Sequence, residues 1–88
     1  MTWTIKISAQ AEKYYKRIDK NRWKAVKVKL NELSNLDSPL QHNQVRPLIG
    51  DLKGFYRMRI GKIRVIFTIL EEEKIIAIVN ILPRGNAY

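Results

Sequence analysis

Arginine and lysine side chains crowd one stretch of this chain in a pattern suited to holding a phosphodiester. Six basic residues lie between positions 45 and 64 against the single acid Asp51, namely Arg46, Lys53, Arg57, Arg59, Lys62 and Arg64. Four of the six are arginines, and a guanidinium grips a phosphate through a planar fork, whereas an ammonium acts as a point charge. A basic strand face that is merely solvated is the simpler alternative, but the clustering of one sign weakens it. The pattern therefore predicts a polyanion as the partner.

Side chains for acid–base or metal chemistry are scarce elsewhere. The chain has no cysteine, which excludes a disulfide framework, a thiolate zinc site and a thiol nucleophile. The single histidine, His42, stands in a polar loop and is predicted to be a surface residue. Glu71, Glu72 and Glu73 are adjacent and cannot all face one site, so we expect a solvated turn there. The sequence therefore predicts no metal and no cofactor.

Strand alternation predicts that three of the arginines share one face of a sheet. Successive side chains of a strand point to opposite faces, and residues 55–60 have the pattern of such a strand. Arg57 and Arg59 therefore project together, away from the apolar residues of that strand. In the following strand, 62–70, the odd positions are apolar and suited to packing under helices. Arg64 is thus expected beside the pair.

Two helices and four strands are predicted to position these residues. They are a strand over 3–7, a helix over 9–18 that follows the N-cap Ser8, a second helix that follows a break at 19–21 and ends before Pro39, and strands over 55–60, 62–70 and 74–82. Residues 37–54 read as a loop with a short paired segment near 45–48. The element order β-α-α-β-β-β predicts an α+β fold, a single small domain over residues 1–88 in which an antiparallel sheet packs against a helical hairpin.

The last strand suggests a surface for a partner protein. Its odd side, with Ile75 and Ile81, is expected to face the helices, which leaves Ile76, Ile78 and Leu82 uncovered on the other side. An exposed apolar stripe beside a basic patch indicates a protein-binding surface. Lys and Arg total 17 against 8 Asp and Glu, and this net charge of +9 favours an acidic partner. We therefore expect an amphipathic, acidic segment to cover this stripe.

Length and composition fit a small folded protein. A chain of 88 residues suffices for one domain, and 45% hydrophobic residues provide a core. The amino terminus lacks the pattern of a secretory signal, and no stretch approaches the roughly 20 apolar residues that span a bilayer. We expect a cytoplasmic protein without membrane contact.

Four segments together resemble the RelE/ParE toxin superfamily over essentially the whole chain. They are Val45-Arg46-Pro47-Leu48, Gly54-Phe55-Tyr56-Arg57-Met58-Arg59, Gly61-Lys62-Ile63-Arg64-Val65-Ile66-Phe67 and Leu82-Pro83-Arg84-Gly85-Asn86-Ala87-Tyr88. The resemblance implies a toxin of a toxin–antitoxin pair, with a sheet packed on a helical hairpin and an acidic, RelB-like antitoxin that wraps the toxin. Members of the RelE branch cut messenger RNA in the ribosomal A site, whereas members of the ParE branch poison DNA gyrase.

The resemblance also implies roles for individual residues. Arg64 sits where the family has a catalytic arginine, Arg84 matches the arginine after the last strand, and Tyr88 matches the tyrosine near the end. The expected RNA-binding residues are Arg46, Arg57 and Arg59, which fall where the RelE branch has positive groups, together with Lys53 and Lys62 from the basic cluster. Arginines here replace lysines that in some members transfer a proton, and the tail is shorter, so that Tyr88 is also the terminal residue.

The function expected from this resemblance is that of a ribosome-dependent endoribonuclease, which cuts messenger RNA and inhibits translation. Attack of a 2′-oxygen on the neighbouring phosphorus needs no metal, and arginines would stabilise the charge on the pentavalent phosphate. Arginine cannot act as a general base because its pKa exceeds about 12, which leaves Tyr88 to transfer a proton or to stack on a base. Two alternatives stay open: a ParE-like gyrase poison without catalysis, and a plain nucleic-acid-binding module.

Overall fold

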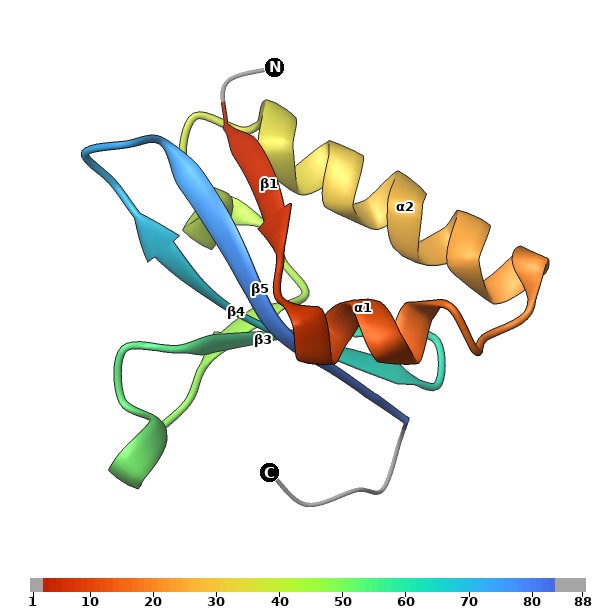
Figure 1. Cartoon of the computed structure of the whole chain (residues 1–88). Coiled ribbons are helices and arrows are strands. Elements are labelled where there is room, and N and C mark those ends of the chain that lie inside the picture. Colours follow the sequence, from red (N-terminus) through yellow and green to blue (C-terminus); the bar gives the residue numbers. More distant parts are fainter. Residues whose placement is uncertain (1–2, 84–88) are drawn as a thin grey trace.

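In the computed structural model, which describes residues 3–83, five strands form one sheet. Both helices pack on the same face of this sheet (Figure 1). In chain order the elements are β1 (Thr4–Ile7), α1 (Ala9–Tyr15), α2 (Lys20–Asn35), the 3₁₀ turn η1 (Pro39–Gln41), β2 (Val45–Pro47), the 3₁₀ turn η2 (Gly50–Leu52), β3 (Tyr56–Ile60), β4 (Ile63–Leu70) and β5 (Ile75–Pro83). The strand order is β1-β5-β4-β3-β2, which confirms the predicted α+β class and the interior position of the two most apolar strands. No helix in this range is long and apolar enough to cross a bilayer.

The sheet is mixed, whereas the sequence predicted a wholly antiparallel one. β1 pairs in parallel with β5, with Thr4 opposite Ile75 and Ile7 opposite Ile78, while the other pairings are antiparallel. The alternation of β1 is the same for either direction, so the sequence pattern could not distinguish them. The short paired segment predicted near residues 45–48 is confirmed as β2, which pairs with β3.

Polar side chains set the starts of both helices. The Ser8 Oγ accepts a hydrogen bond from the Ala11 N–H (3.1 Å), and the Asp19 Oδ1 accepts one from the Arg22 N–H (2.8 Å). Such N-caps satisfy amide groups that have no partner inside the helix. α1 ends at Tyr15, three residues before the predicted end, because the chain must leave the helix to place Asp19 in the extended conformation of a cap.

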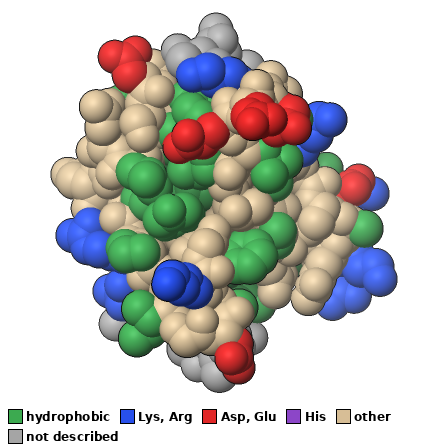
Figure 2. Space-filling view, turned by 90° about the vertical axis from the view of Figure 1, so that its left-hand side faces the viewer, with side chains coloured by type: hydrophobic (Ala, Val, Ile, Leu, Met, Phe, Trp, Pro, Cys, Tyr) green, Lys and Arg blue, Asp and Glu red, His purple; other side chains and the backbone are tan. Residues whose placement is uncertain are grey.

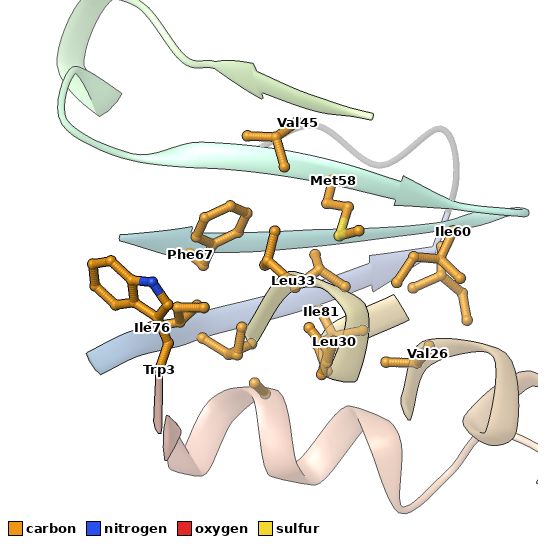
Figure 3. Packing of buried hydrophobic residues seen from close by; sticks show 14 residues of the cluster. Trp3, Val26, Leu30, Leu33, Val45, Met58, Ile60, Phe67, Ile76 and Ile81 are labelled. Carbon is orange, nitrogen blue, oxygen red and sulfur yellow. The ribbon is translucent and has the colours of Figure 1, made fainter. Parts of the chain in front are cut away.

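The core lies between the sheet and one face of α2 (Figure 3). Its most deeply buried members are Ala11 from α1, Val26 and Leu33 from α2, and Met58, Val65, Phe67, Ile76, Ile78 and Ile81 from the strands. The buried Trp3 closes one end of this cluster, and its indole N–H donates a hydrogen bond to the Asp37 carbonyl (3.2 Å). Tyr15 and Trp23 stack with their ring centroids 4.5 Å apart, which joins the two helices. The helices thus occupy one face of the sheet and do not cover the other.

β5 does not present the faces that its sequence predicted. Ile76 and Ile78, expected on the uncovered side, are 0% and 1% exposed and lie in the core. Ile75, expected under the helices, is only partly buried, whereas Ile81 is buried as predicted. The predicted stripe for an acidic partner on Ile76, Ile78 and Leu82 is therefore wrong.

A β-bulge explains this difference. Phe67 pairs with Ile78, but its predecessor Ile66 pairs with Asn80, so that Val79 is an extra residue in β5. An extra residue reverses the alternation of all side chains that follow it in the strand. For this reason even positions face the core before the bulge, and an odd position, Ile81, faces it afterwards.

Candidate phosphate-binding face

Four arginines project from the sheet on the face opposite the helices. The strand register sets Arg46 of β2 opposite Arg57 of β3, and Arg59 of β3 opposite Arg64 of β4. The alternating neighbours on these strands are buried under the helices, so the four side chains share the remaining face. We call these four residues the arginine face. The shared face predicted for Arg57, Arg59 and Arg64 is confirmed, and Arg46 belongs to it as well.

Both arginine pairs on this face are directly opposed across neighbouring strands. Opposed side chains have Cβ atoms about 4.5–5.5 Å apart, and like charges at such positions are destabilising. Within residues 3–83, neither Arg57 nor Arg59 forms an ion pair with a carboxylate. An anion laid over the face would offset this repulsion. The arrangement therefore fits a ligand that carries several negative charges.

Nearby groups restrict two of the guanidinium side chains. The Arg46 Nη1 donates to the carbonyls of Asn43 (2.7 Å) and Val45 (2.9 Å), which holds it beside the loop before β2. The Arg64 Nε is buried, and Ile66, two residues further along β4, is only 4% exposed. A phosphate that meets Arg64 here is partly shielded from water, which strengthens its attraction to the guanidinium.

A small pocket opens at the end of the β3–β4 hairpin. It has a volume of about 160 Å³ and is lined by Arg59, Gly61, Lys62, Ile63 and Arg64. Gly61 has a φ of +59°, a left-handed conformation that is strained for other residues, and it makes the tight turn between the strands. This turn brings the predicted binding residue Lys62 together with Arg59 and Arg64. Lys53 follows η2, is exposed and does not line the pocket.

Two of the predicted catalytic residues, Arg84 and Tyr88, lie outside the described residues. Their convergence with Arg64 therefore stays a prediction. The described part of β5 supports it indirectly, because Leu82 pairs with Arg64 and Pro83 pairs with Ile63. The strand that precedes these residues thus ends beside the pocket.

His42 is not the free surface residue that the sequence predicted. Its side chain is only 9% exposed, and its Nε2 lies 3.4 Å from the Glu32 Oε1 of α2. Its Nδ1 accepts a hydrogen bond from the Gln44 N–H (3.1 Å), so Nε2 is the nitrogen left to donate to the carboxylate. The two partners are ten positions apart in the chain, so the sequence pattern showed no sign of this contact. His42 links α2 to the loop that leads into β2 and Arg46.

The bulge brings one further polar side chain to the arginine face that the sequence analysis missed. Asn80 pairs with Ile66, which in turn pairs with Arg57, so these three side chains form one row across the sheet. The Asn80 Oδ1 accepts from the Ile81 N–H (2.9 Å). The available signal was a polar residue inside an otherwise apolar strand.

Comparison with known proteins gives one family and several similar structures. The family model for the ParE toxin of type II toxin–antitoxin systems, parDE, matches residues 5–88. No curated protein sequence matches the chain. A chain of the archaeal RelE–RelB complex from Pyrococcus horikoshii OT3 is 28% identical with a TM-score of 0.77, over 99% of this chain and 100% of that one.

Two further structures share the fold at lower identity. A chain of the RelBE2 toxin–antitoxin complex from Mycobacterium tuberculosis is 22% identical with a TM-score of 0.81, over 98% of this chain and 95% of that one. A chain of the YoeB–YefM complex from Staphylococcus aureus is 22% identical with a TM-score of 0.76, over 100% of both chains. At this level of identity the likeness extends to the fold alone.

Proposed function

Because the chain belongs to the ParE toxin family of type II toxin–antitoxin systems, within the RelE/ParE superfamily, we propose that this toxin is a ribosome-dependent endoribonuclease that cuts messenger RNA in the cytoplasm. The observation that carries the proposal is the opposition of Arg46 to Arg57 and of Arg59 to Arg64. Two opposed arginines repel each other, but both attract an RNA backbone, which carries one negative charge per nucleotide. Loss of the message would then stop translation.

In the proposed reaction, the 2′-oxygen of one nucleotide attacks its own 3′-phosphorus in line with the 5′-oxygen of the next. The new P–O bond yields a 2′,3′-cyclic phosphate, the bond to the 5′-oxygen breaks, and the proton lost by the 2′-hydroxyl is balanced by one gained at the 5′-oxygen. Arg64 and Arg84 donate hydrogen bonds to the pentavalent phosphate, and Arg57 and Arg59 hold flanking phosphates. Tyr88 stacks on a base and takes part in proton transfer.

The chemistry of the arginine face supports the proposed dependence on the ribosome. Arginine cannot serve as a general base, so the rate must come chiefly from holding the substrate in the reactive geometry. We infer that the ribosome supplies this alignment when the message lies in the A site. The toxin is then expected to cut ribosome-bound message at discrete positions, and naked RNA of the same sequence at least about 100-fold more slowly. Equal rates on both substrates would remove the ribosome from the proposal.

Replacement of Arg64 by alanine tests the catalytic role. Loss of one donor to a charged transition state typically costs about 10²- to 10³-fold in rate, so Arg64→Ala should abolish growth arrest and the cuts mapped by primer extension. Arg17→Ala is the matched control, because it removes an exposed arginine on the helix side of the sheet. A folded Arg64→Ala toxin that still cuts at the normal rate would contradict the role.

A gyrase poison is the second candidate, because the matching family model is that of a ParE toxin. In that case the arginines bind without catalysis, and messages stay intact. Expression of the toxin followed by parallel mapping of RNA ends and of gyrase-linked DNA breaks separates the two. DNA breaks with intact message would mean that the protein is a gyrase poison and not a nuclease. If neither RNA cuts nor DNA breaks are found, the remaining candidate is a plain nucleic-acid-binding module.

An acidic, RelB-like antitoxin is the proposed partner of this toxin. The similar structures include toxins in complex with their antitoxins, among them RelE–RelB and YoeB–YefM. The net charge of +9 favours such an acidic protein. Because the antitoxin would bind the folded toxin, it is expected to stabilise it.

A further inference from the structure

Phe55 is an aromatic residue that lies outside the core, on the side of the sheet that carries the arginine face. Its carbonyl accepts a hydrogen bond from the Leu48 N–H (3.0 Å), which extends the pairing of β2 and β3 by one residue. Alternation along this extended strand places Phe55 on the same face as Arg57, two positions later. Tyr56, between them, packs against the core, with its ring centroid 5.9 Å from that of Phe67.

No other aromatic residue in the range 3–83 has such a location. The others lie in the core or pack against it: Trp3, Tyr14, Tyr15, Trp23, Tyr56 and Phe67. Phe55 belongs to neither group, although its side chain is partly buried. Its apolar ring therefore does not fill the core, and it lies beside cations to which the proposed function assigns phosphates.

Hydrogen bonds from three segments hold the backbone around Phe55. Its N–H donates to the Leu52 carbonyl of η2 (3.0 Å), and its carbonyl is held by Leu48. The Thr68 Oγ1 of β4 donates to the carbonyl of the preceding residue, Gly54 (2.9 Å). The φ of Gly54 is +97°, a conformation that favours glycine. The ring thus projects from a well-held backbone, so little conformational entropy is lost when a ligand packs on it.

An aromatic ring beside guanidinium groups matches the two chemical parts of an unpaired nucleotide. Arginines attract its phosphate, and the flat face of its base can stack on the ring. Positions two apart on a strand are separated by about 6.6 Å, so a base can contact Phe55 while a neighbouring phosphate contacts Arg57. A duplex hides the faces of its bases within the helical stack. The arrangement therefore favours unpaired RNA.

We propose that Phe55 stacks on a base of the unpaired RNA whose backbone lies on the arginine face, an inference that rests on the proposed RNA substrate. Every base has a π-face, so this contact adds affinity without selecting a sequence. It also holds the strand in place along β3, next to Arg57. The toxin should therefore bind unpaired RNA in preference to a duplex of the same length.

Binding of a short, unpaired RNA tests this contact, with the 2′-hydroxyls methylated so that the RNA cannot be cut. Phe55→Ala should weaken binding by about 5- to 150-fold, the typical effect of losing one base–aromatic stack. Phe55→Tyr keeps a ring and should bind within about 2-fold of the unchanged toxin. Phe55→Leu keeps apolar volume without a ring and should bind about as weakly as Phe55→Ala. If Phe55→Leu binds as tightly as the unchanged toxin, the proposal is wrong.

Leu70→Ala is the matched control on the same face of the sheet. Leu70 is 42% exposed, and its neighbour Ile69 packs against the core, so alternation directs Leu70 to the side of Arg64. It precedes three exposed glutamates at 71–73, and acidic side chains gather at one end of the surface shown in Figure 2. RNA is repelled there, so Leu70→Ala should change binding less than about 2-fold. Equal losses in Leu70→Ala and Phe55→Ala would overturn the proposal.

Two further ligands show whether the lost affinity comes from a base. On a sugar–phosphate strand of the same length without bases, Phe55→Ala should bind as tightly as the unchanged toxin, whereas Arg57→Ala should lose affinity for both strands. On an RNA duplex the effect of Phe55→Ala should also vanish. If Phe55→Ala weakens binding of all three ligands equally, Phe55 supports the fold and not a stacked base, and the inference is wrong.

These measurements separate failure of this inference from failure of the proposed function. If message stays intact in cells but the loss in Phe55→Ala depends on the bases, the nuclease proposal fails and the stacking inference stands. If the toxin cuts ribosome-bound message but Phe55→Ala binds every ligand as tightly as the unchanged toxin, the stacking inference is wrong and the nuclease proposal stands. Absence of binding of the unpaired RNA at about 1 mM would also overturn the stacking inference.

Discussion

At Arg59, the proposed binding role and the stability of the fold make opposite demands. Arg59 lies opposite Arg64 across β3 and β4, and like charges at directly opposed positions of neighbouring strands are destabilising. Alternation in the sequence was enough to predict that these side chains share a face. Their direct opposition depends on the register that the turn at Gly61 imposes, which no alternation pattern specifies.

Replacing Arg59 by threonine should therefore stabilise the toxin and impair it. The substitution removes one like-charge pair and introduces threonine, a residue that favours strands. It is therefore expected to raise the free energy of unfolding by about 0.2–1 kcal/mol. Urea unfolding followed by tryptophan fluorescence measures this change, and RNA cleavage should fall in the same variant. Arg17→Thr, at an exposed site, should alter neither quantity. A destabilised Arg59→Thr variant would show that Arg59 is held by favourable contacts instead.

Ser8 is a second residue that does more than the sequence predicted, which was only a role as the N-cap of α1. Its Oγ caps α1 and also donates to the Val79 carbonyl (2.8 Å), at the bulge of β5. Ser8→Ala should lower the free energy of unfolding by about 1–2 kcal/mol in urea unfolding, because two hydrogen bonds are lost. Ser38→Ala is the control, because Ser38 precedes η1 without a side-chain cap bond. Equal effects of both changes would contradict the role of Ser8.

Among the elements, β5 marks the limit of what the sequence pattern could predict. The helices, the strands and their order along the chain follow from periodicity, because each amphipathic face repeats at the spacing of its own element. β5 is apolar on both parities, so nothing in it indicated which side the helices cover. The bulge that decides this depends on contacts with Ser8 and on pairing with β4, which are distant in the chain.

Two alanine variants test the bulged register of β5. Ile76 is fully buried, so Ile76→Ala should destabilise the protein by about 2–5 kcal/mol. Ile75 is only partly buried on the opposite face, and Ile75→Ala should cost less than about 1 kcal/mol. Urea unfolding of both variants gives the comparison. The reverse order of the two costs would support the unbulged strand that the sequence pattern predicted.

For the whole molecule, the sheet divides the surface into two regions of different chemistry. The arginine face carries opposed cations and suits a polyanion, whereas a groove between α2 and β1 is apolar and is also lined by Lys24 and Lys27. Net charge alone predicted an anionic partner but could not assign it to a surface, because the 17 basic residues occur outside the cluster at 45–64 as well as within it. The groove was not predicted from the sequence. Its walls are β1 and α2, and each of them has the usual amphipathic pattern of an element that packs on a core.

The salt dependence of RNA binding tests this division. Each phosphate contact with a single strand contributes about −0.7 to the slope of log K against log salt, so four contacts on the arginine face predict a slope of about −2.8. Arg57→Ala should reduce its magnitude to about 2.1, while Lys24→Ala, at the groove, should leave it unchanged. Titrations of a short, non-cleavable RNA at several salt concentrations give both slopes. If the two variants reduce the slope equally, RNA contacts the toxin on both sides of the sheet, and the arginine face is not a distinct binding surface.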